Sequence, residues 1–408
     1  MKKLALLASL FLFVFTSCEN EIDDSEYTSV AVPVKQSLQE FRASVKIQEP
    51  KDIQESGKIY AWNNYIFIND VQKGVHIIDN IDPFNPKNVQ FINIPRNMDV
   101  AVKDNKLYAD SGTDLVIFDL QDMNNIKEIG RVENVFPNVF PQTQLNATFI
   151  DYENFDPEKE VIIGFVIEKR KIEYATQPNW EDAFFANSAE SSTGTGGSFA
   201  RFSIKDDYLY VADDQKLSVF DIRNPAQTTL LNQDYAGFAI ETLFNYEDHL
   251  YLGSDRGLYI FSIEDAAKPK EVSYLQHVLG CDPVVVEGDY AYVTIRGGNF
   301  CGQENNQLDV VNITDKHSPF IEQSYQMTNP YGLGIKGDWL FVCDGADGLK
   351  VFDKSNTPNL ELIDHFKEIN TYDVIPLEER LLMVGDNTLY QYSYKGNEVN
   401  LISTFTIN

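Results

Sequence analysis

The stretch Trp339-Leu340-Phe341, followed after a turn by Gly348-Leu349-Lys350-Val351-Phe352-Asp353, decides the fold of this chain. A short apolar run ends in an aromatic residue, a turn containing Asp and Gly follows, and a second apolar run ends in Asp. Short runs rich in β-branched and aromatic residues, separated by turn residues, predict β-strands. The same pattern occurs at 65–67 with 74–79 and at 208–210 with 217–221.

The pattern recurs at a nearly constant interval. The ends of the first runs are separated by 41, 102, 41, 41, 49 and 41 residues, and the ends of the second runs by 40, 102, 41, 50, 41 and 40. A period of about 41 residues built from short strands is typical of a propeller blade, because one such sheet cannot bury its own faces. We therefore predict an all-β, seven-bladed β-propeller of four-stranded blades. The first-run anchors are Phe67, Tyr108, Tyr210, Tyr251, Tyr292, Phe341 and Leu382, and the second-run anchors are Asp79, Asp119, Asp221, Ser262, Asn312, Asp353 and Ser393.

Two intervals are longer than the period. The interval of 102 predicts an insertion over about 137–197, between the outer strand of the second copy and the inner strand of the third. Its apolar run 161–167 and the charged run after it predict a long strand, interpreted as an extended outer strand, and Ser188–Ser198 is expected to be mobile. A degenerate eighth blade within the insertion is the alternative. The interval near 50 predicts an expanded turn between the second and third strands of copy five.

Each copy is expected to contain four strands. In copy four they are predicted near Thr242–Asn245, His249–Gly253, Leu258–Ser262 and Glu271–Leu275. Helical periodicity is nearly absent after residue 50, and Ser37–Val45 is the one candidate for a short helix. The predicted propeller domain therefore spans residues 41–408.

The repeats resemble those of the LVIVD-repeat β-propeller family of secreted bacterial proteins. The stretches that carry the resemblance are Asp344–Asp353, Gly257–Phe261 and Ile77–Pro86. The resemblance implies a propeller and an extracytoplasmic location, and because the family has no established common activity it implies no catalytic residue. Three copies depart from the family pattern, with Ser262, Asn312 and Ser393 in place of the terminal Asp.

The first residues predict export and anchoring. Lys2-Lys3 precedes the apolar run Leu4–Phe15, which is too short to span a bilayer and is typical of a cleaved signal. Phe15–Cys18 resembles the lipobox of bacterial lipoproteins, which predicts a signal peptide over 1–17, diacylglyceryl modification of Cys18 and a flexible tether over 18–40. An ordinary signal peptide with an incidental Cys is the alternative.

The location of the anchor is also predicted. The acidic cluster Glu19–Asp24 resembles the surface-export signal of Bacteroidetes-type lipoproteins, although a solvated acidic tether is the alternative. We expect an outer-membrane, lipid-anchored protein at the cell surface. The formal net charge of −29 opposes binding to nucleic acid or to an anionic membrane surface, so the predicted partners are the membrane through the anchor and a protein or glycan.

Three cysteines remain if Cys18 is lipidated. Cys281 lies in the connection entering copy five and Cys301 in its expanded turn. Because both loops are expected at the same end of the blade, we predict a Cys281–Cys301 disulfide, with two free thiols as the alternative. Cys343 is expected to be a small buried residue on a second strand.

Ligands of propellers usually lie where the innermost strands begin. Aligning the copies places polar side chains at these starts, and such convergent groups are suited to a sugar, a peptide or a cation. Polar strand ends near solvent are the plain structural alternative. The candidate ligand-binding residues are Lys58, Asp99, Arg201, Glu241, Asp282, Tyr331, Tyr372 and Asp373.

Catalytic signals are poor. The five histidines are predicted on strands or peripheral turns, and no nucleophile elbow, phosphate loop or zinc motif occurs. Asp344–Gly348 lacks the length and terminal Glu of an EF-hand, so we expect a turn, no metal and no cofactor. The favoured function is binding of an extracellular partner through the loop-bearing face. The alternatives are a hydrolase or lyase using carboxylates such as Asp99 and Asp373, and a docking subunit of an outer-membrane assembly.

Overall fold

The computed structural model describes residues 27–137, 147–171, 200–277, 283–297, 305–395 and 398–407. They separate into two compact units. The smaller contains the described residues within 27–35, 141–156 and 162–183, and the larger contains the rest. Cys18, Cys281, Cys301 and Asp282 lie outside the described residues, so the lipidation and the disulfide stay predictions.

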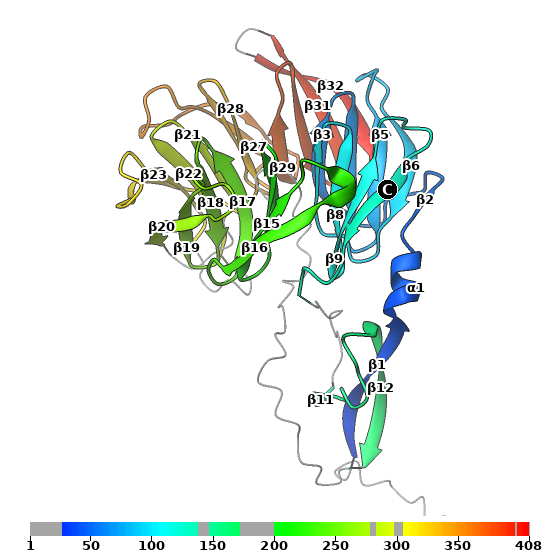
Figure 1. The fold of residues 1–408 in the computed structure, drawn as a ribbon. Helices are drawn as coiled ribbons and strands as arrows, with labels where there is room; N and C mark the ends of the chain where they lie inside the picture. Colours follow the sequence, from blue (N-terminus) through cyan, green and yellow to red (C-terminus); the bar gives the residue numbers. More distant parts are fainter. Residues whose placement is uncertain are drawn as a thin grey trace, which may run out of the picture. The chain divides into compact units, whose positions relative to one another are not determined.

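Seven sheets follow one another along the larger unit, each built from consecutive antiparallel strands (Figure 1). Sheets 2 to 7 have four strands, and sheet 1 has a fifth, β2 (Lys46–Gln48), paired with β6. Sheets 1 to 3 contain β3 (Ser56–Trp62), β4 (Tyr65–Asp70), β5 (Gly74–Asp79), β6 (Lys87–Asn93); β7 (Val100–Lys103), β8 (Lys106–Ser111), β9 (Asp114–Asp119), β10 (Lys127–Val132); and β13 (Phe202–Lys205), β14 (Tyr208–Ala212), β15 (Lys216–Asp221), β16 (Thr229–Tyr235).

The remaining sheets repeat this order. Sheets 4 and 5 contain β17 (Ile240–Tyr246), β18 (His249–Ser254), β19 (Gly257–Ser262), β20 (Lys270–Gln276); and β21 (Val284–Glu287), β22 (Tyr290–Ile295), β23 (Gln307–Asn312), β24 (Phe320–Gln326). Sheets 6 and 7 contain β25 (Leu333–Lys336), β26 (Trp339–Cys343), β27 (Leu349–Asp353), β28 (Glu361–Phe366); and β29 (Thr371–Pro376), β30 (Arg380–Gly385), β31 (Thr388–Lys395), β32 (Glu398–Thr406). The predicted strands of copy four agree with β17–β20 to within two residues at each end.

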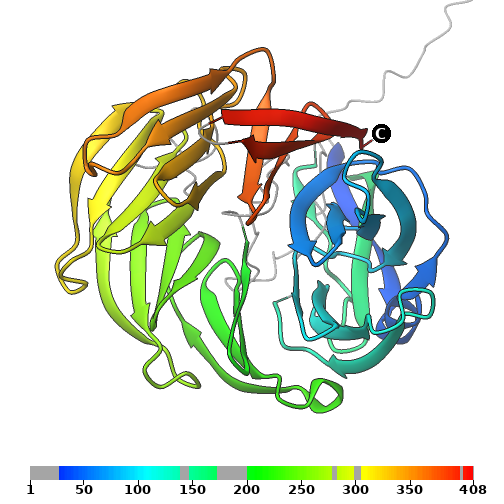
Figure 2. The same cartoon turned by 90° about the horizontal axis from the view of Figure 1, so that it is seen from above.

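The first strand of each sheet contacts the first strand of the next, from β3 through β7, β13, β17, β21 and β25 to β29. Figure 2 shows the sheets of this unit arranged around a common axis. The prediction of an all-β propeller is confirmed. The expanded turn of copy five is also confirmed, because β22 ends at Ile295 and β23 begins at Gln307.

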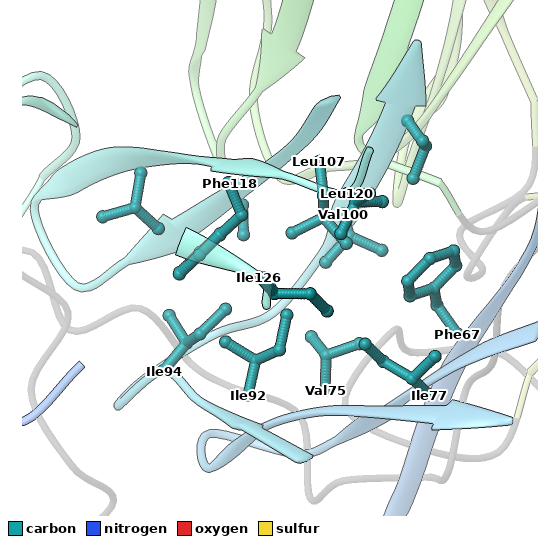
Figure 3. Packing of buried hydrophobic residues seen from close by; sticks show 13 residues of the cluster. Phe67, Val75, Ile77, Ile92, Ile94, Val100, Leu107, Phe118, Leu120 and Ile126 are labelled. Carbon is teal, nitrogen blue, oxygen red and sulfur yellow. The ribbon is translucent and has the colours of Figure 1, made fainter. Parts of the chain in front are cut away.

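The anchor side chains form the core between sheets. All seven first-run anchors are at most 2% exposed. Between sheets 1 and 2, Phe67 and Ile77 pack against a layer that includes Leu107 and Phe118 (Figure 3). Burying a large apolar side chain stabilises a fold by about 1.5–3 kcal/mol, so this repeated position holds adjacent sheets together.

Every one of these seven sheets carries a β-bulge at the same place. The fourth strand has one extra residue opposite the middle of the third, as at Ile77/Ile78 in sheet 1 and Val351/Phe352 in sheet 6. Bulges bend and twist an outer strand, which discourages pairing with another chain. The shared bulge is a second structural sign that the seven sheets are copies of one unit.

The second-run anchors explain the recurring Asp. In six sheets the anchor side chain accepts a hydrogen bond from the backbone N–H two residues later, which starts the turn to the fourth strand. Ser262 and Asn312 make the same bond, so the departures from the family pattern preserve the turn. The distances are 3.0 Å for Asp79, Asp119, Asp221 and Asn312, 2.8 Å for Asp353 and 3.3 Å for Ser262.

Sheets 1 and 7 close the ring (Figure 2, blue and red). The amide Nδ2 of Asn80 donates to Gln391 Oε1 at 2.9 Å, and Gln391 Nε2 donates to Asn80 Oδ1 at 2.7 Å. Both residues are buried. An apolar cluster beside this pair joins Ile59, Ile66 and other residues of sheet 1 to Leu382, Val384 and Leu389 of sheet 7.

The short helix predicted within Ser37–Val45 is confirmed as α1 (Leu38–Ala43). Its N-cap Ser37 accepts from Glu40 N–H and forms a capping box with the Glu40 side chain. Arg42 Nε then donates to Asp114 at 2.8 Å, which ties α1 to sheet 2. The predicted flexible tether is wrong for its described part, because Tyr27–Ser37 forms the strand β1 and α1 follows it.

The smaller unit contributes a three-stranded sheet in the order β11 (Phe149–Ile150), β1, β12 (Glu160–Lys171). The long strand predicted in the insertion is confirmed as β12. Its interpretation as an extended outer strand is wrong, since β12 pairs with β1. The predicted mobile stretch 188–198 lies outside the described residues. Where the chain is described, no helix has the length and apolar character needed to cross a bilayer.

We predict that ring closure depends on the amide pair. Replacing Gln391 by Ala should lower the free energy of unfolding by about 2–3 kcal/mol, because the buried Asn80 amide loses both partners. Urea denaturation checks this. The Asn80→Ala, Gln391→Ala double variant should lose less than the sum of the single losses, and strict additivity would contradict the proposed coupling.

Candidate functional site

The candidate residues lie at one end of the sheets, here called the loop-bearing end. At this end the inner strands begin, the second strands finish and the third strands start. The long insertion after β10, the β20–β21 connection and the expanded β22–β23 turn all leave the sheets here. The opposite end, where first and second strands join, is called the hairpin end.

Lys58, Asp99 and Arg201 form one connected group across sheets 1, 2 and 3. Lys58 Nζ donates to Asp99 Oδ2 at 2.9 Å. The same oxygen accepts the backbone N–H groups of Arg201 and Phe202, and Asp99 Oδ1 accepts Val100 N–H. Asp99 is 3% exposed. Its carboxylate therefore accepts from four donors and links sheets 1, 2 and 3. We call this link the Asp99 clasp.

Asp110, at the end of β8, holds the segment that carries Asp99. Its Oδ1 accepts the backbone N–H of Met98 at 3.0 Å and of Asp99 at 2.9 Å, and the amide of Asn97 at 2.9 Å. Burial raises the pKa of Asp110 to about 6, although these backbone hydrogen bonds act in the opposite direction. A proton on Oδ2 leaves Oδ1 free to accept from all three donors.

Equivalent carboxylates stand at the ends of other second strands. Asp70 accepts Gln54 and Glu55 N–H, Asp344 accepts Thr328 and Asn329 N–H, and Asp386 accepts Asn370 N–H. Each carboxylate thus satisfies the backbone of the connection that enters its own sheet. This explains the Asp that recurs after the first apolar run.

Arg201 and Glu241 form a second group between sheets 3 and 4. Arg201 Nε donates to the backbone carbonyl of Glu241 at 3.2 Å. Among the described residues, the terminal nitrogens of Arg201 and the carboxylate of Glu241 have no hydrogen-bond partner. Burial raises the pKa of Glu241 to about 6, and the nearby charges of Arg201 and Arg296 lower it.

Two further carboxylates surround this group. Burial raises the pKa of Asp214, which lies in the β14–β15 turn, and Arg201 acts against that rise. Burial also raises the pKa of Asp255, in the β18–β19 turn, with Arg256 acting against it and Asp214 adding to it. The backbone carbonyl of Asp214 accepts Ile240 N–H at 2.9 Å, which holds this turn beside Glu241.

Arg296, Tyr331 and Tyr372 form a third group over sheets 5, 6 and 7. The Arg296 guanidinium lies 4.1 Å from the centre of the Tyr331 ring, and the Tyr331 and Tyr372 rings meet edge to face at 5.3 Å. Asp373 is fully buried beside them. A Cβ on Gly332 would lie 2.0 Å from Asp373 Oδ1, so only glycine permits this approach.

The remaining candidates have structural roles. His76 Nε2 lies 3.4 Å from Asp70 and both are fully buried, while His249 and His365 lie on β18 and β28 and His317 in a peripheral turn. Lys350 contacts Asp344 and Asp347, so an ammonium group occupies the site a cation would need. No cluster of metal-ligating side chains occurs among the described residues. Cys343 is fully buried, as predicted.

The sequence therefore placed the described candidates at the starts of inner strands, but it did not show which of their side chains contact one another. It predicted equivalent roles for Lys58, Asp99, Arg201, Glu241, Tyr331, Tyr372 and Asp373, whereas the structure divides them into three groups. It missed Asp110, Asp214, Asp255 and Arg296. Asp110 lies near the end of a second strand and Asp214 and Asp255 just after one, where the repeated Asp was the available signal, whereas Arg296 has no repeat signal.

We predict that Asp99 stabilises the ring. Asp99→Asn should lower the free energy of unfolding by about 2–3 kcal/mol, because Lys58 loses the charged partner of a hydrogen bond in a mostly buried setting. Urea denaturation measures the loss. Adding Lys58→Met should restore part of it, and an unchanged stability of Asp99→Asn would contradict the clasp.

We also predict a pH-dependent contribution from Asp110. Its pKa is raised to about 6 from 3.8, so the folded state binds the proton more tightly than the unfolded state. The resulting stability is present below about pH 4 and is lost as the pH rises to about 6, by up to about 3 kcal/mol. The Asp110→Asn variant lacks this pH-dependent contribution. Its free energy of unfolding, measured relative to that of wild type, should therefore rise between about pH 4 and pH 7. If the free energy of unfolding depended on pH in the same way in both proteins, the raised pKa of Asp110 would be contradicted.

The model of the LVIVD repeat matches residues 196–233, 281–327 and 332–367 of this chain. These stretches fall on sheets 3, 5 and 6, and the matches support the predicted repeat family. No curated protein matches the sequence.

Solved structures share the fold at low identity. The periplasmic gluconolactonase PpgL of Pseudomonas aeruginosa has a TM-score of 0.55 and 10% identity, with 88% of this chain and 96% of that one covered. The computationally designed Ika8 protein has 0.54 and 9%, with 88% and 89% covered, and BamB of Moraxella catarrhalis has 0.50 and 8%, with 91% and 99% covered. Identities this low show the fold alone. The chain is a β-propeller scaffold, and three of its repeats match the LVIVD repeat.

Proposed function

We propose that this protein is a seven-bladed propeller that binds an extracytoplasmic ligand or partner at its loop-bearing end. The observation that carries the proposal is the Arg201–Glu241 group, in which the terminal guanidinium nitrogens of Arg201 and the nearby carboxyl group of Glu241 have no hydrogen-bond partner among the described residues. Partly buried charged groups are costly unless they are paired, so their unused bonding capacity favours a ligand.

The hairpin end offers a contrast. There, Lys103 Nζ lies 3.1 Å from Asp207 of the next sheet, and Lys205 Nζ lies 3.5 Å from Asp248. These lysines brace neighbouring sheets, so their charges are satisfied within the protein. The difference between the two ends supports the loop-bearing end as the binding face.

Location forms part of the same proposal. The signal peptide over 1–17 and the lipobox ending at Cys18 support anchoring by lipid in the outer membrane, and the acidic residues after Cys18 support display at the cell surface. Replacing Cys18 by Ser should move the protein from the membrane fraction to the soluble fraction. Retention of the variant in the membrane would count against the anchor.

We predict that capture of a partner depends on the Arg201–Glu241 group. The tagged protein is used in a pull-down from detergent-solubilised membranes of the native host, with Arg201→Lys and Glu241→Gln as test variants and Lys205→Gln at the hairpin end as the matched control. A protein captured by wild type and the control, but lost from both test variants, supports binding at this end. Equal capture by all four would contradict it.

The pull-down also separates the docking alternative. A stoichiometric membrane partner that remains bound through purification would indicate a subunit of an outer-membrane assembly. Capture of no protein leaves small ligands and glycans for the loop-bearing end, and these require a direct binding assay.

A hydrolase or lyase is the second candidate. One observation favours it, because a carboxyl group with a pKa of about 6 is suited to general acid catalysis near neutral pH. The occupied carboxylate of Asp99 argues against a catalytic role for that residue. Turnover of a glycoside or ester that Glu241→Gln abolishes, while Lys205→Gln retains it, would support an enzyme.

A further inference from the structure

Arg201 and Glu241, at the loop-bearing end, carry polar atoms that make no hydrogen bond among the described residues, and the two sets of atoms are complementary. The terminal nitrogens of Arg201 are donors only, and the ionised carboxylate of Glu241 is an acceptor only. Arg201 lies immediately before β13 and Glu241 lies in β17, and the Arg201 Nε bond to the Glu241 carbonyl holds them next to each other. Among the described residues, neither group forms an ion pair with the other or has another hydrogen-bond partner.

Charge around this group is close to balanced. Lys58 already neutralises Asp99 by direct contact. Arg201 opposes Glu241 and Asp214, Arg296 opposes Glu241, and Arg256 lies 3.6 Å from Asp255, while burial raises the pKa of all three of these carboxyl groups. The site therefore has no strong excess of either sign, which disfavours selection of a ligand by its net charge.

We propose that the ligand of the loop-bearing end is an uncharged saccharide whose neighbouring hydroxyl groups bridge the terminal nitrogens of Arg201 and the carboxyl group of Glu241. This inference rests on the proposed function and names the ligand class for that site. One hydroxyl group accepts from the guanidinium and donates to the carboxylate, so a pair of adjacent hydroxyls satisfies both residues without adding charge.

A saccharide also fits the titration of the site. A carboxyl group hydrogen-bonds to a hydroxyl both when ionised and when protonated, because the hydroxyl donates or accepts. Affinity for a neutral sugar should thus change little between about pH 5 and pH 8. A cationic ligand would instead bind more tightly above the pKa of Glu241, about 6, and an anionic ligand more tightly below it.

The test uses the mature protein on an array of tetrasaccharides matched in length. Neutral glucose, mannose and galactose tetramers are compared with a galacturonic acid tetramer and a glucosamine tetramer. We expect retention of a neutral tetramer, with affinity reduced about tenfold or more in Arg201→Lys and in Glu241→Ala, since the first loses the paired guanidinium donors and the second loses the hydrogen-bonding carboxyl group. Lys205→Gln should bind as wild type does, and thermal unfolding checks that all variants are folded.

Each other outcome overturns the inference in a distinguishable way. Retention of only the acidic or only the amino tetramer would show a ligand chosen by charge, and would leave binding at this end intact if the two variants lost it. Retention of a neutral tetramer unaffected by either variant would place the sugar elsewhere. If no tetramer is retained, the saccharide is excluded, and the pull-down decides separately whether the loop-bearing end binds a protein.

Discussion

A four-stranded sheet with apolar residues on both faces is unstable unless another sheet covers each face, and this constraint governs the whole propeller. The aromatic or aliphatic anchor on each second strand lies in the layer between sheets, and sheets 1 and 7 would each leave one face uncovered if the ring did not close. Among the described strands, none is exchanged between these two sheets, and the contacts that join them are made by side chains. The apolar cluster buries apolar surface between sheets 1 and 7. The reciprocal hydrogen bonds of the Asn80 and Gln391 amides add a directional contact that fixes how the two sheets meet.

The same constraint creates a problem at the loop-bearing end. Each connection from one sheet to the next brings backbone N–H groups into partly buried positions, where unpaired donors are costly. Carboxylates at the ends of second strands solve it in sheets 1, 2, 6 and 7, and Asp99 extends the solution across three sheets. Much of the acidity of this end therefore has a structural cause.

Against that background, the Arg201–Glu241 group differs from its neighbours. Lys58 and Asp99 satisfy each other, and Asp344 has Lys350. Arg201 uses only Nε, which donates to the Glu241 backbone carbonyl, among the described residues. The carboxyl group of Glu241 has a pKa raised by burial. The inference of a ligand comes from this contrast between satisfied and unsatisfied groups, which the count of acidic residues at the end does not reveal.

The sequence determined the repeated elements, because strands, turns and buried anchors depend on residues close together in the chain. The 41-residue period, the strands of copy four, the helix within 37–45 and the burial of Cys343 follow from such local patterns. Only the tertiary structure decided the partners. It paired β12 with β1, linked Asp99 to three sheets and, among the described residues, left the terminal nitrogens of Arg201 and the carboxyl group of Glu241 without partners. Each of these outcomes depends on residues brought together from different sheets or distant segments, and periodicity carries no information about which side chains then meet.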